Sequence, residues 1–263
     1  MAGPVQWLLA SSGVRRVARR TADWIDLAWW QLHEQLVTFA PRASGRLLDV
    51  GCGEKPYEPI FRPYVTEYVG VEYAPVFETT QSSKRATGPD LYYDGKTLPF
   101  PDDSFDTVIS IQVLEHTPHP QTVVDEMSRV AKKGGLVLVH VPFSFRLHEE
   151  PNDFFRYTPH GLRSMFDGAG IEVEGLWPMG GLWSVVGHKL NSYLAYRVAR
   201  AGALGQAMGK AGHEGTRVAP ARTWTLPAVV PAMTAISAAS RVLDRLAPDE
   251  TEALCYLVFG RKR

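Results

Sequence analysis

The chain has 263 residues, of which 45% are hydrophobic and 21% charged, a composition typical of a folded globular protein. The 28 Lys and Arg residues balance the 28 Asp and Glu residues, so no overall charge favours nucleic acid as a partner. Cys52 and Cys255 are the two cysteines, which argues against a disulfide framework or a zinc site and favours a reducing compartment. No apolar run approaches the roughly 18 residues of a membrane span, and no secretory signal pattern opens the chain, so we expect a cytoplasmic protein.

The first forty residues are rich in tryptophan and arginine and carry apolar residues at helical spacing. One interpretation is a basic amphipathic helix that rests on a membrane surface or closes over a substrate. The other is a helix packed on the core, with its arginines in solvent. For residues 23–39 we favour packing, because amphipathic stripes usually face inward. For residues 5–20 both interpretations stay open, and peripheral membrane contact is therefore one of the predictions.

Short apolar runs alternate with helical patterns through the first half of the chain. Gly134-Gly135 ends a helix predicted over 121–132, and an uninterrupted apolar strand follows at 136–141. Earlier strands are predicted at 46–50, 68–72, 91–94 and 105–111. This alternation indicates an α/β fold, a doubly wound and mostly parallel seven-stranded sheet with helices on both faces.

The second half adds a helical insertion before the last strand. A helix over 159–169 and a strand at 171–176 precede the insertion, and a closing strand at 253–259 follows it. The roughly 75 residues between these two strands far exceed an ordinary connection, and 182–204 and 225–246 have helical patterns. The insertion serves as a lid, a dimer surface, a membrane-facing patch or a helical pair packed on the sheet edge. The predicted organisation is an N-terminal helical cap at 1–40, a core at 41–181 and 253–263, and a helical insert at 182–252.

The segment Asp49-Val50-Gly51-Cys52-Gly53 follows the first predicted strand. An apolar strand that ends in an acid and two glycines predicts a tight turn where a ligand can approach the backbone. In doubly wound sheets such turns bind nucleotide-like cofactors. The full Gly-x-Gly-x-x-Gly pattern is absent, because Pro56 stands at its third glycine position, which argues against hydride chemistry with a dinucleotide.

Four segments, taken in order, resemble the class I S-adenosylmethionine-dependent methyltransferases. Residues 48–53 resemble the first motif of that superfamily, and residues 69–72 resemble its second strand with a terminal acid. Residues 98–106 and 112–116 resemble the LPFPDxSFD and LEH blocks of the small-molecule branch that includes the ubiquinone and menaquinone methyltransferases. The resemblance covers residues 45–176 and the last strand.

The resemblance implies which residues hold the cofactor, S-adenosyl-L-methionine. Gly51 and Gly53 let the backbone approach its methionine end, where a bulky side chain would clash. Asp49 receives its ammonium group, directly or through water. Glu72, at a strand end, accepts hydrogen bonds from the vicinal ribose hydroxyls.

Two further positions follow from the same resemblance, and one departs from it. Asp94 matches the position that contacts adenine, with an acid in an ordinary turn as its alternative. Gln112 lies where the family lines the methionine side of the pocket. Lys55 stands where many members carry a third glycine, and Pro56 after it is expected near the first turn of the next helix.

Methyl transfer to a hydroxyl requires an acceptor in line with the methyl carbon and a base. His148, in the polar loop after the strand at 136–141, is the first candidate base, and a loop histidine paired with a neighbouring glutamate is its alternative. His116 is the second candidate, with a capping or packing role as its favoured alternative. The carboxylates and imidazoles of this loop are also divalent-metal ligand types, but no fixed spacing supports a metal site, and none is predicted.

These observations predict a methyltransferase that acts on a small molecule. The residues His148–Asp153 resemble loops of methyltransferases associated with glycan and polyketide modification, which favours O-methylation of a sugar, glycolipid or natural-product hydroxyl. C-methylation of a quinone-like or other apolar acceptor is the first alternative. A non-catalytic, cofactor-binding assembly partner is the second. A homodimer is left open, and no nucleic-acid partner is expected.

Overall fold

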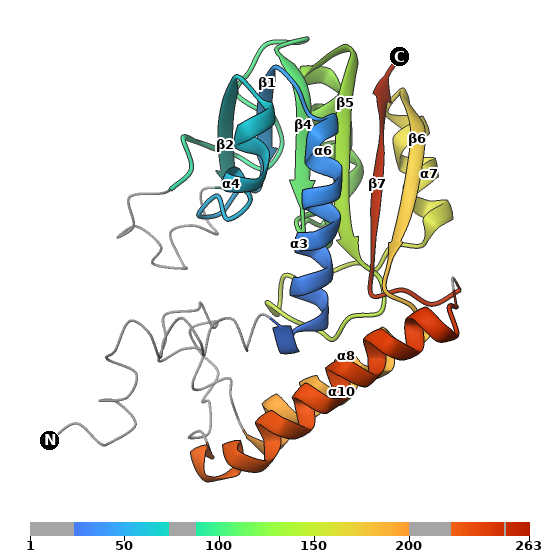
Figure 1. Ribbon diagram of the computed structural model, residues 1–263. Helices are drawn as coiled ribbons and strands as arrows, with labels where there is room; N and C mark the ends of the chain where they lie inside the picture. The colour runs from blue at the N-terminus through green and yellow to red at the C-terminus, as the bar shows by residue number, and fades with distance from the viewer. Residues whose placement is uncertain (1–23, 74–87, 200–221, 250) are drawn as a thin grey trace, which may run out of the picture.

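The computed structural model describes residues 24–73, 88–199, 222–249 and 251–263 (Figure 1). At its centre is a seven-stranded sheet in the order β3-β2-β1-β4-β5-β7-β6. β7 pairs antiparallel with β5 and β6, whereas the other pairings are parallel, which confirms the mostly parallel, doubly wound sheet. The strands are β1 (Arg46–Val50), β2 (Glu67–Tyr73), β3 (Leu91–Tyr93), β4 (Phe105–Ile111), β5 (Ala131–Pro142), β6 (Ile171–Met179) and β7 (Cys255–Lys262).

Helices cover both faces of the sheet. Leu36 of α3 and Phe61 of α4 are buried in the apolar cluster on one face, and Val124 of α6 and Phe166 of α7 in the cluster on the other. The α-helices are α3 (Leu27–Phe39), α4 (Glu58–Phe61), α6 (Pro120–Val130), α7 (Pro159–Gly168), α8 (Leu182–Tyr193) and α10 (Leu226–Leu246). Short helical turns are η1 (Ala40–Arg42), η2 (Arg62–Tyr64), η3 (Leu114–His116), η4 (Leu194–Val198) and η5 (Thr223–Thr225).

Capping residues fix where two of these helices begin. The side chain of Asp26 accepts a hydrogen bond from the Trp29 N–H at 3.2 Å at the start of α3. Thr158 accepts from the Gly161 N–H at 3.1 Å, and Pro159 occupies the first turn of α7. Because α3 packs its apolar stripe on the sheet, the packing interpretation of residues 23–39 is confirmed. The arginine-rich segment 5–20 lies outside the described residues.

The boundary between α6 and β5 differs from the prediction. The helix ends at Val130, and β5 begins at Ala131, before the two glycines that were expected to end the helix. Ala131 pairs with Phe105 of β4, and the register then shifts before Leu136 pairs with Thr107. Gly134, with φ of 73°, therefore lies in an irregular stretch of strand and does not cap a helix.

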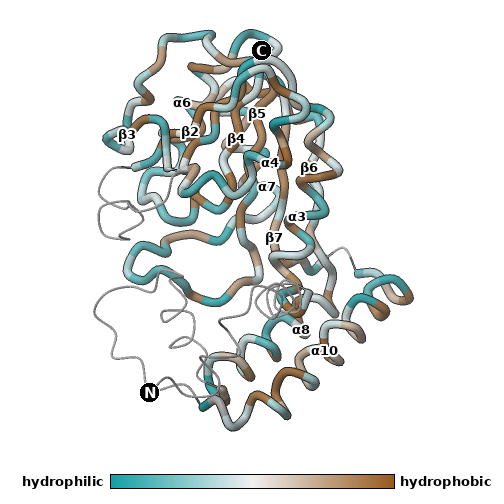
Figure 2. The backbone as a smooth tube through the Cα atoms, turned by 60° about the vertical axis from the view of Figure 1, so that its left-hand side comes forward, coloured by the Kyte–Doolittle hydropathy of each residue, from teal (hydrophilic) through white to brown (hydrophobic). Residues whose placement is uncertain are grey.

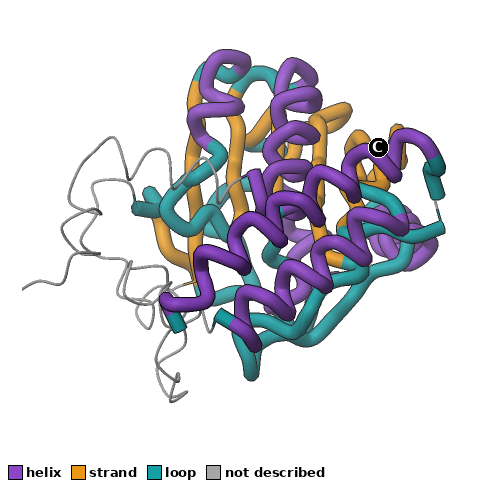
Figure 3. Tube along the Cα trace, turned by 60° about the horizontal axis from the view of Figure 1, so that its bottom comes forward, coloured by secondary structure: helices purple, strands orange, loops and turns teal. Residues whose placement is uncertain are grey.

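The helices α8 and α10 lie side by side at one end of the domain (Figures 1 and 3). The parallel strands point toward this pair, so their carboxyl ends face it (Figure 1). α8 continues into the π-helical turn η4, which ends at Val198, and the rest of the predicted helix 182–204 lies outside the described residues beyond Ala199. The helical insertion thus borders the sheet edge where doubly wound folds bind their ligands.

Candidate functional site

The glycine turn after β1 has the backbone that the sequence predicted. Gly51 and Gly53 both adopt positive φ, 77° and 52°, where glycine is favoured. A Cβ on Gly51 would lie 2.4 Å from the side chain of Val113, so Gly51 is required for close packing. A Cβ on Gly53 would meet nothing within 4 Å, so this glycine faces open space. Gly53 is therefore the position where a ligand can lie against the backbone.

Glu72, at the end of β2, is tied to this turn. One carboxylate oxygen accepts a hydrogen bond from the Gly53 N–H at 2.7 Å, and the other from the Tyr73 N–H at 2.9 Å. Burial raises the pKa of Glu72, and these two backbone hydrogen bonds lower it in part. Each carboxylate oxygen has a second lone pair, so the carboxylate can also accept the two ribose hydroxyls.

Asp49 is a buried carboxyl with a raised pKa. Its side chain is 1% exposed and accepts a hydrogen bond from the Tyr68 hydroxyl at 2.5 Å. Burial raises the pKa of Asp49 to about 7, although the bond from Tyr68 lowers it. A cation placed beside this carboxyl would favour its charged form, which fits the ammonium group of the predicted cofactor. The hydrogen bond from Tyr68 to Asp49 was not predicted, because Tyr68 lies in an ordinary strand pattern of the sequence.

The turn lacks a third glycine, and Lys55 occupies that position. It adopts φ of 54°, the left-handed conformation that a glycine would adopt there. Its amine lies 2.5 Å from the carboxylate of Asp90, which also accepts the Gly70 N–H at 2.7 Å. The expectation for Pro56 was wrong: α4 begins at Glu58, and a later proline occupies its first turn.

The structure places Asp94 and Gln112 differently from the turn residues. Asp94 is exposed after β3, and its carboxylate accepts the N–H groups of Lys96 and Thr97 at 2.8 and 2.9 Å. This is the turn role that the sequence left as an alternative, and the adenine contact stays a prediction. Gln112 has φ of 58°, and its side-chain amide lies 2.8 Å from Nδ1 of His140, inside the sheet. Its place on the methionine side of the pocket also stays a prediction.

His116 and His148, the two candidate bases, lie in contact. Their rings meet edge to face with centroids 4.8 Å apart. Nδ1 of His116 lies 2.7 Å from the carbonyl oxygen of Asn152, so it carries the proton and leaves Nε2 as an acceptor. Nδ1 of His148 lies 3.3 Å both from the carbonyl oxygen of Arg146 and from the carboxylate of Asp153. Both imidazoles therefore have Nε2 available to remove a proton.

An internal ion pair holds the loop that carries His148. Asp153 accepts two hydrogen bonds from the guanidinium of Arg156, at 2.6 and 2.7 Å, and one from the His148 N–H at 2.9 Å. Burial acts to raise the pKa of Asp153, but these hydrogen bonds lower it to about 2. Arg156 also donates to the carbonyl of Arg146 at 3.0 Å. The backbone around His148 is thus fixed from both sides.

Glu115 is a buried acid that was not among the predicted site residues. Neither carboxylate oxygen has a hydrogen-bond partner, and burial raises its pKa to about 8, so it is mostly protonated at pH 7. One oxygen lies 3.8 Å from Nε2 of His116. Glu115, His116 and His148 bring ligand atoms within 4.8 Å of one another, a spread wider than a bound zinc ion with bonds of about 2 Å would allow. No sequence signal reveals that this acid is buried.

The histidine loop packs near the glycine turn: the Phe154 N–H of the loop donates to the carbonyl of Glu115 at 2.8 Å, and Val113, two residues before Glu115, lies against Gly51. The carboxylate of Glu149 contributes to the raised pKa of Glu72, which burial mainly causes. Tyr57, after the turn, has its pKa raised by burial and then by Asp49 and Glu115. The cofactor candidates and the base candidates therefore lie within electrostatic reach of one another at one edge of the sheet.

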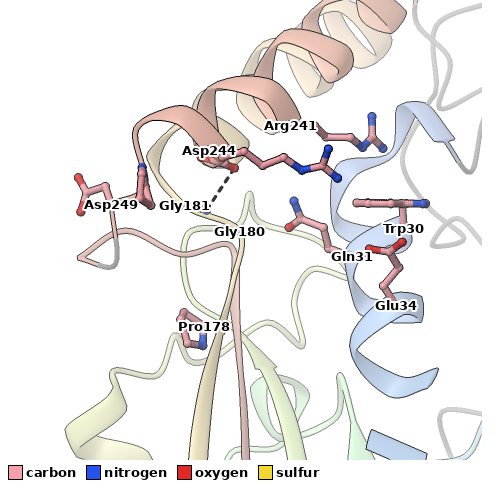
Figure 4. A pocket seen from close by; sticks show the side chains of 11 residues that line it. Trp30, Gln31, Glu34, Pro178, Gly180, Gly181, Arg241, Asp244 and Asp249 are labelled. Atoms are coloured by element: carbon pink, nitrogen blue, oxygen red, sulfur yellow. Dashed lines mark hydrogen bonds between the residues drawn. The ribbon is translucent and has the colours of Figure 1, made fainter. Parts of the chain in front are cut away.

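A pocket of about 300 Å³ lies elsewhere, between α3, the end of β6 and the last turns of α10 (Figure 4). Asp244 accepts the Gly181 N–H across it at 3.4 Å. Arg241 and Arg245 oppose Glu34, Asp244 and Asp249 in its lining, so it favours neither anions nor cations. None of the predicted cofactor or base residues lines it. We interpret this pocket as a junction between helices.

Comparisons with known proteins bear on this arrangement. Residues 48–139 match the family described as “Methyltransferase domain”. An “uncharacterized methyltransferase” of Mycobacterium tuberculosis (strain ATCC 25177 / H37Ra) is 37% identical over 128 residues, 48% of this chain and 48% of that protein. One of Mycobacterium leprae (strain Br4923) is 34% identical over 133 residues, 48% of this chain and 45% of that protein. The chain thus spans about half the length of the curated relatives it matches.

Solved structures share the fold. A SAM-dependent methyltransferase from Thermotoga maritima has a TM-score of 0.51 at 15% identity and covers 95% of this chain and 97% of its own. The cyclase SpnF has a TM-score of 0.52 at 20% identity and covers 89% of this chain and 82% of its own. These likenesses show that the chain has the fold of these structures, and residues 48–139 are similar to a methyltransferase domain. Because a cyclase shares that fold, the reaction has to be argued from the site.

Proposed function

We propose that this protein transfers a methyl group from S-adenosylmethionine to a hydroxyl of a small molecule. The observation that carries the proposal is the position of His148. Asp153 orients its imidazole, which contacts His116, and Val113, three residues before His116, lies against Gly51 of the glycine turn. The matched methyltransferase domain and its relatives support the choice of cofactor. The sugar, glycolipid or natural-product class of the acceptor rests on the resemblance of the loop sequence alone.

The residues around the turn fit S-adenosylmethionine. Gly53 leaves room against the backbone, Glu72 offers acceptors for ribose hydroxyls, and Asp49 offers a buried carboxyl for a cation. When bound, S-adenosylmethionine supplies an electrophilic methyl carbon on a sulfonium sulfur. The chain has to hold the acceptor in line with that carbon and exclude water from it, which are the main contributions to such a transfer.

His148 is the group that we assign to proton removal. Burial and the neighbouring His116 lower the pKa of His148, so the imidazole is neutral at pH 7 and has a lone pair on Nε2. As the acceptor oxygen bonds to the methyl carbon, the carbon–sulfur bond breaks and the hydroxyl proton passes to Nε2. The products are a methyl ether, S-adenosylhomocysteine and an imidazolium. Asp153, beside Nδ1, stabilises that imidazolium.

C-methylation of an apolar acceptor is the second candidate. Phe154 and Phe155 support it, because these loop phenylalanines are large and exposed next to the histidine pair. A carbon nucleophile such as a quinol ring also loses a proton, so the histidine does not distinguish the two reactions. The position of the added methyl group in the product would distinguish the two reactions.

The first experiment is calorimetry with S-adenosylmethionine. Binding is expected, and no binding at millimolar concentration would overturn the enzyme proposal in favour of a non-catalytic assembly partner. The second is release of S-adenosylhomocysteine with a panel of sugar, glycolipid and phenol acceptors. His148→Gln should lower the rate by about a hundredfold or more, the range of general-base catalysis, with the cofactor affinity unchanged.

A matched control uses His160, an exposed histidine on α7 outside the cluster. His160→Gln should keep the wild-type rate. A His148→Gln variant that methylates hydroxyl acceptors at the wild-type rate would remove this residue from the mechanism. Dialysis against a chelator should leave the rate unchanged, and a loss that Zn²⁺ or Mg²⁺ restores would instead assign Glu115 and the two histidines to a metal.

A further inference from the structure

The helix α10 has its polar and apolar faces reversed with respect to a helix of a water-soluble domain. Its buried positions include the serines Ser237 and Ser240, whereas Val230, Val242 and Leu246 are exposed. By length and composition it is apolar enough to cross a membrane, and 17% of its most apolar window is buried. Figure 2 shows brown, hydrophobic stretches along this helix outside the body of the domain. In water, such a face is normally turned inward.

The helix α8 has the same reversal. Beside Val185 and Gly187, its buried residues are the polar Ser184, His188 and Asn191. Its exposed residues include Leu190 and Tyr193, and Tyr196 follows in η4. Both helices therefore expose apolar side chains and bury polar ones, and they lie side by side (Figure 3).

The two helices pack against each other as helices do in lipid. The side-chain amide of Asn191 donates to Ser237 at 2.8 Å across the interface. A Cβ on Gly187 would lie 2.1 Å from the hydroxyl of Ser240, so the backbones approach closely at that point. Small residues at the contact and hydrogen bonds between polar side chains are typical of helix pairs whose outer face meets hydrocarbon.

The exposed charges on the pair are all positive. Lys189 of α8 and Arg245 of α10 are exposed, as are Arg197 in η4 and Arg222 before η5, and Asp244, the one described acid on the two helices, turns inward. Its carboxylate accepts the backbone N–H groups of Trp183 and Ser184 at 3.0 and 3.1 Å, at the start of α8. An apolar face bordered by basic side chains is complementary to an anionic lipid surface.

We propose that the α8–α10 pair docks on the surface of an anionic lipid bilayer, with both helices lying in the plane of the membrane. A spanning orientation of α10 conflicts with its attachments to the domain. Ser237 donates to the carbonyl of Ile25 at 2.8 Å, next to α3, and the guanidinium of Arg241 lies over the rings of Trp24 and Trp30 at 4.3 and 4.5 Å. Withdrawal of α10 into the membrane would break these contacts.

The pair also contacts the loop that carries the proposed base. Phe145 packs against His148 with ring centroids 5.3 Å apart and against His188 of α8 at 4.5 Å. The guanidinium of Arg146 lies 3.8 Å from the ring centre of Tyr196. Docking would therefore hold the catalytic loop next to the bilayer. If the proposed function is correct, the acceptor is an amphiphile with a hydroxylated headgroup that is taken from the membrane surface.

The test is sedimentation with vesicles, without cofactor or acceptor, so that its outcome is independent of the proposed reaction. The full chain should bind vesicles of phosphatidylcholine and phosphatidylglycerol, more weakly at high salt, and bind vesicles of phosphatidylcholine alone less well. Val230→Glu and Leu190→Glu should each weaken binding about tenfold or more, because each removes the burial of an apolar side chain.

The matched control is Val37→Glu on α3, since Val37 is 48% exposed and lies on a helix outside the pair. It should leave vesicle binding unchanged, and all three variants should keep the wild-type melting temperature. Absence of vesicle binding by the wild-type chain, or an equal loss in the Val37 variant, would overturn the proposal. So would a dimer in light scattering that Val230→Glu converts to a monomer, because a second copy would then cover this face.

Discussion

Asp49 gives the sharpest prediction, because burial of its charged carboxylate destabilises the folded state but provides a partner for the ammonium group of the cofactor. The pKa of this carboxyl rises from 3.8 to about 7 when the chain folds. A raised carboxyl pKa means that the folded state prefers the protonated form. The resulting stabilisation is complete below the unfolded pKa and is lost as the pH rises through the folded pKa, between about 4 and 7. At pH 8 the folded protein holds a buried anion that the unfolded chain would hydrate.

The size of the effect follows from these two pKa values. The full shift corresponds to about 4 kcal/mol at 1.36 kcal/mol per pKa unit. Between pH 8 and pH 5 the linkage relation gives about 3 kcal/mol of added stability from this group. For a domain of this size, that is roughly 5–10 °C in Tm. Other buried acids, Glu115 among them, change stability in the same direction, so the contribution of Asp49 has to be isolated by difference.

Asp49→Asn removes the titration and keeps an oxygen that can accept the Tyr68 hydroxyl. The Tm difference between this variant and the wild type should favour the variant at pH 8 and shrink or reverse toward pH 5. The variant should also bind S-adenosylmethionine at least about tenfold more weakly, because a charge-assisted hydrogen bond contributes about 1.5–3 kcal/mol. Tyr68→Phe is the opposing variant: it removes the bond that lowers the pKa of Asp49, so its Tm should depend on pH more steeply. A Tm difference between Asp49→Asn and the wild type that does not change from pH 5 to 8 would refute this reasoning.

Two further predictions test the turn and the loop. Gly53→Ala should lower the stability by about 1–2 kcal/mol and weaken S-adenosylmethionine binding, as scanning calorimetry and titration would report. Gly134 also has a positive φ and open surroundings, so Gly134→Ala should cost as much stability but leave the affinity unchanged. Asp153→Asn should lower both Tm and the methylation rate, because it removes the negative charge and one of the two acceptor oxygens that face the Arg156 guanidinium. Asp167→Asn, which breaks an exposed pair with Arg263, should cost less than about 1 kcal/mol and leave the rate unchanged. Equal losses of affinity in the two glycine variants, or equal losses of rate in the two aspartate variants, would contradict the roles assigned here.

The sheet and the turn could be predicted because their signals are local. Buried parallel strands require runs of apolar residues, and the strand at 105–111 was predicted to the residue. The presence of glycine at Gly51 and Gly53 predicts positive φ there, because few other residues adopt it readily. Lys55 adopts the same conformation without such a signal, because a long-range ion pair with Asp90 supports it.

The rest of the site depends on contacts between distant segments. The bond from Tyr68 to Asp49 and the burial of Glu115 arise only when strands and loops pack together. One signal was missed: His140 interrupts the apolar strand at 136–141, and it is fully buried with its pKa lowered to about 3 by burial. A histidine inside such a strand indicates a polar contact within the sheet, and here Gln112 provides it.

The reversal of α8 and α10 follows the same physics. Hydrophobic periodicity identifies the stripe on a helix, but not whether that stripe faces the protein or another apolar phase. The buried polar set decides between them. Asn191 donates to Ser237, Ser237 donates to the carbonyl of Ile25, and Asp244 accepts the first N–H groups of α8. If the pair were turned over, these groups would lose the partners named here. The inward face is therefore fixed by hydrogen bonds, and the outward face is the one that we propose to meet lipid.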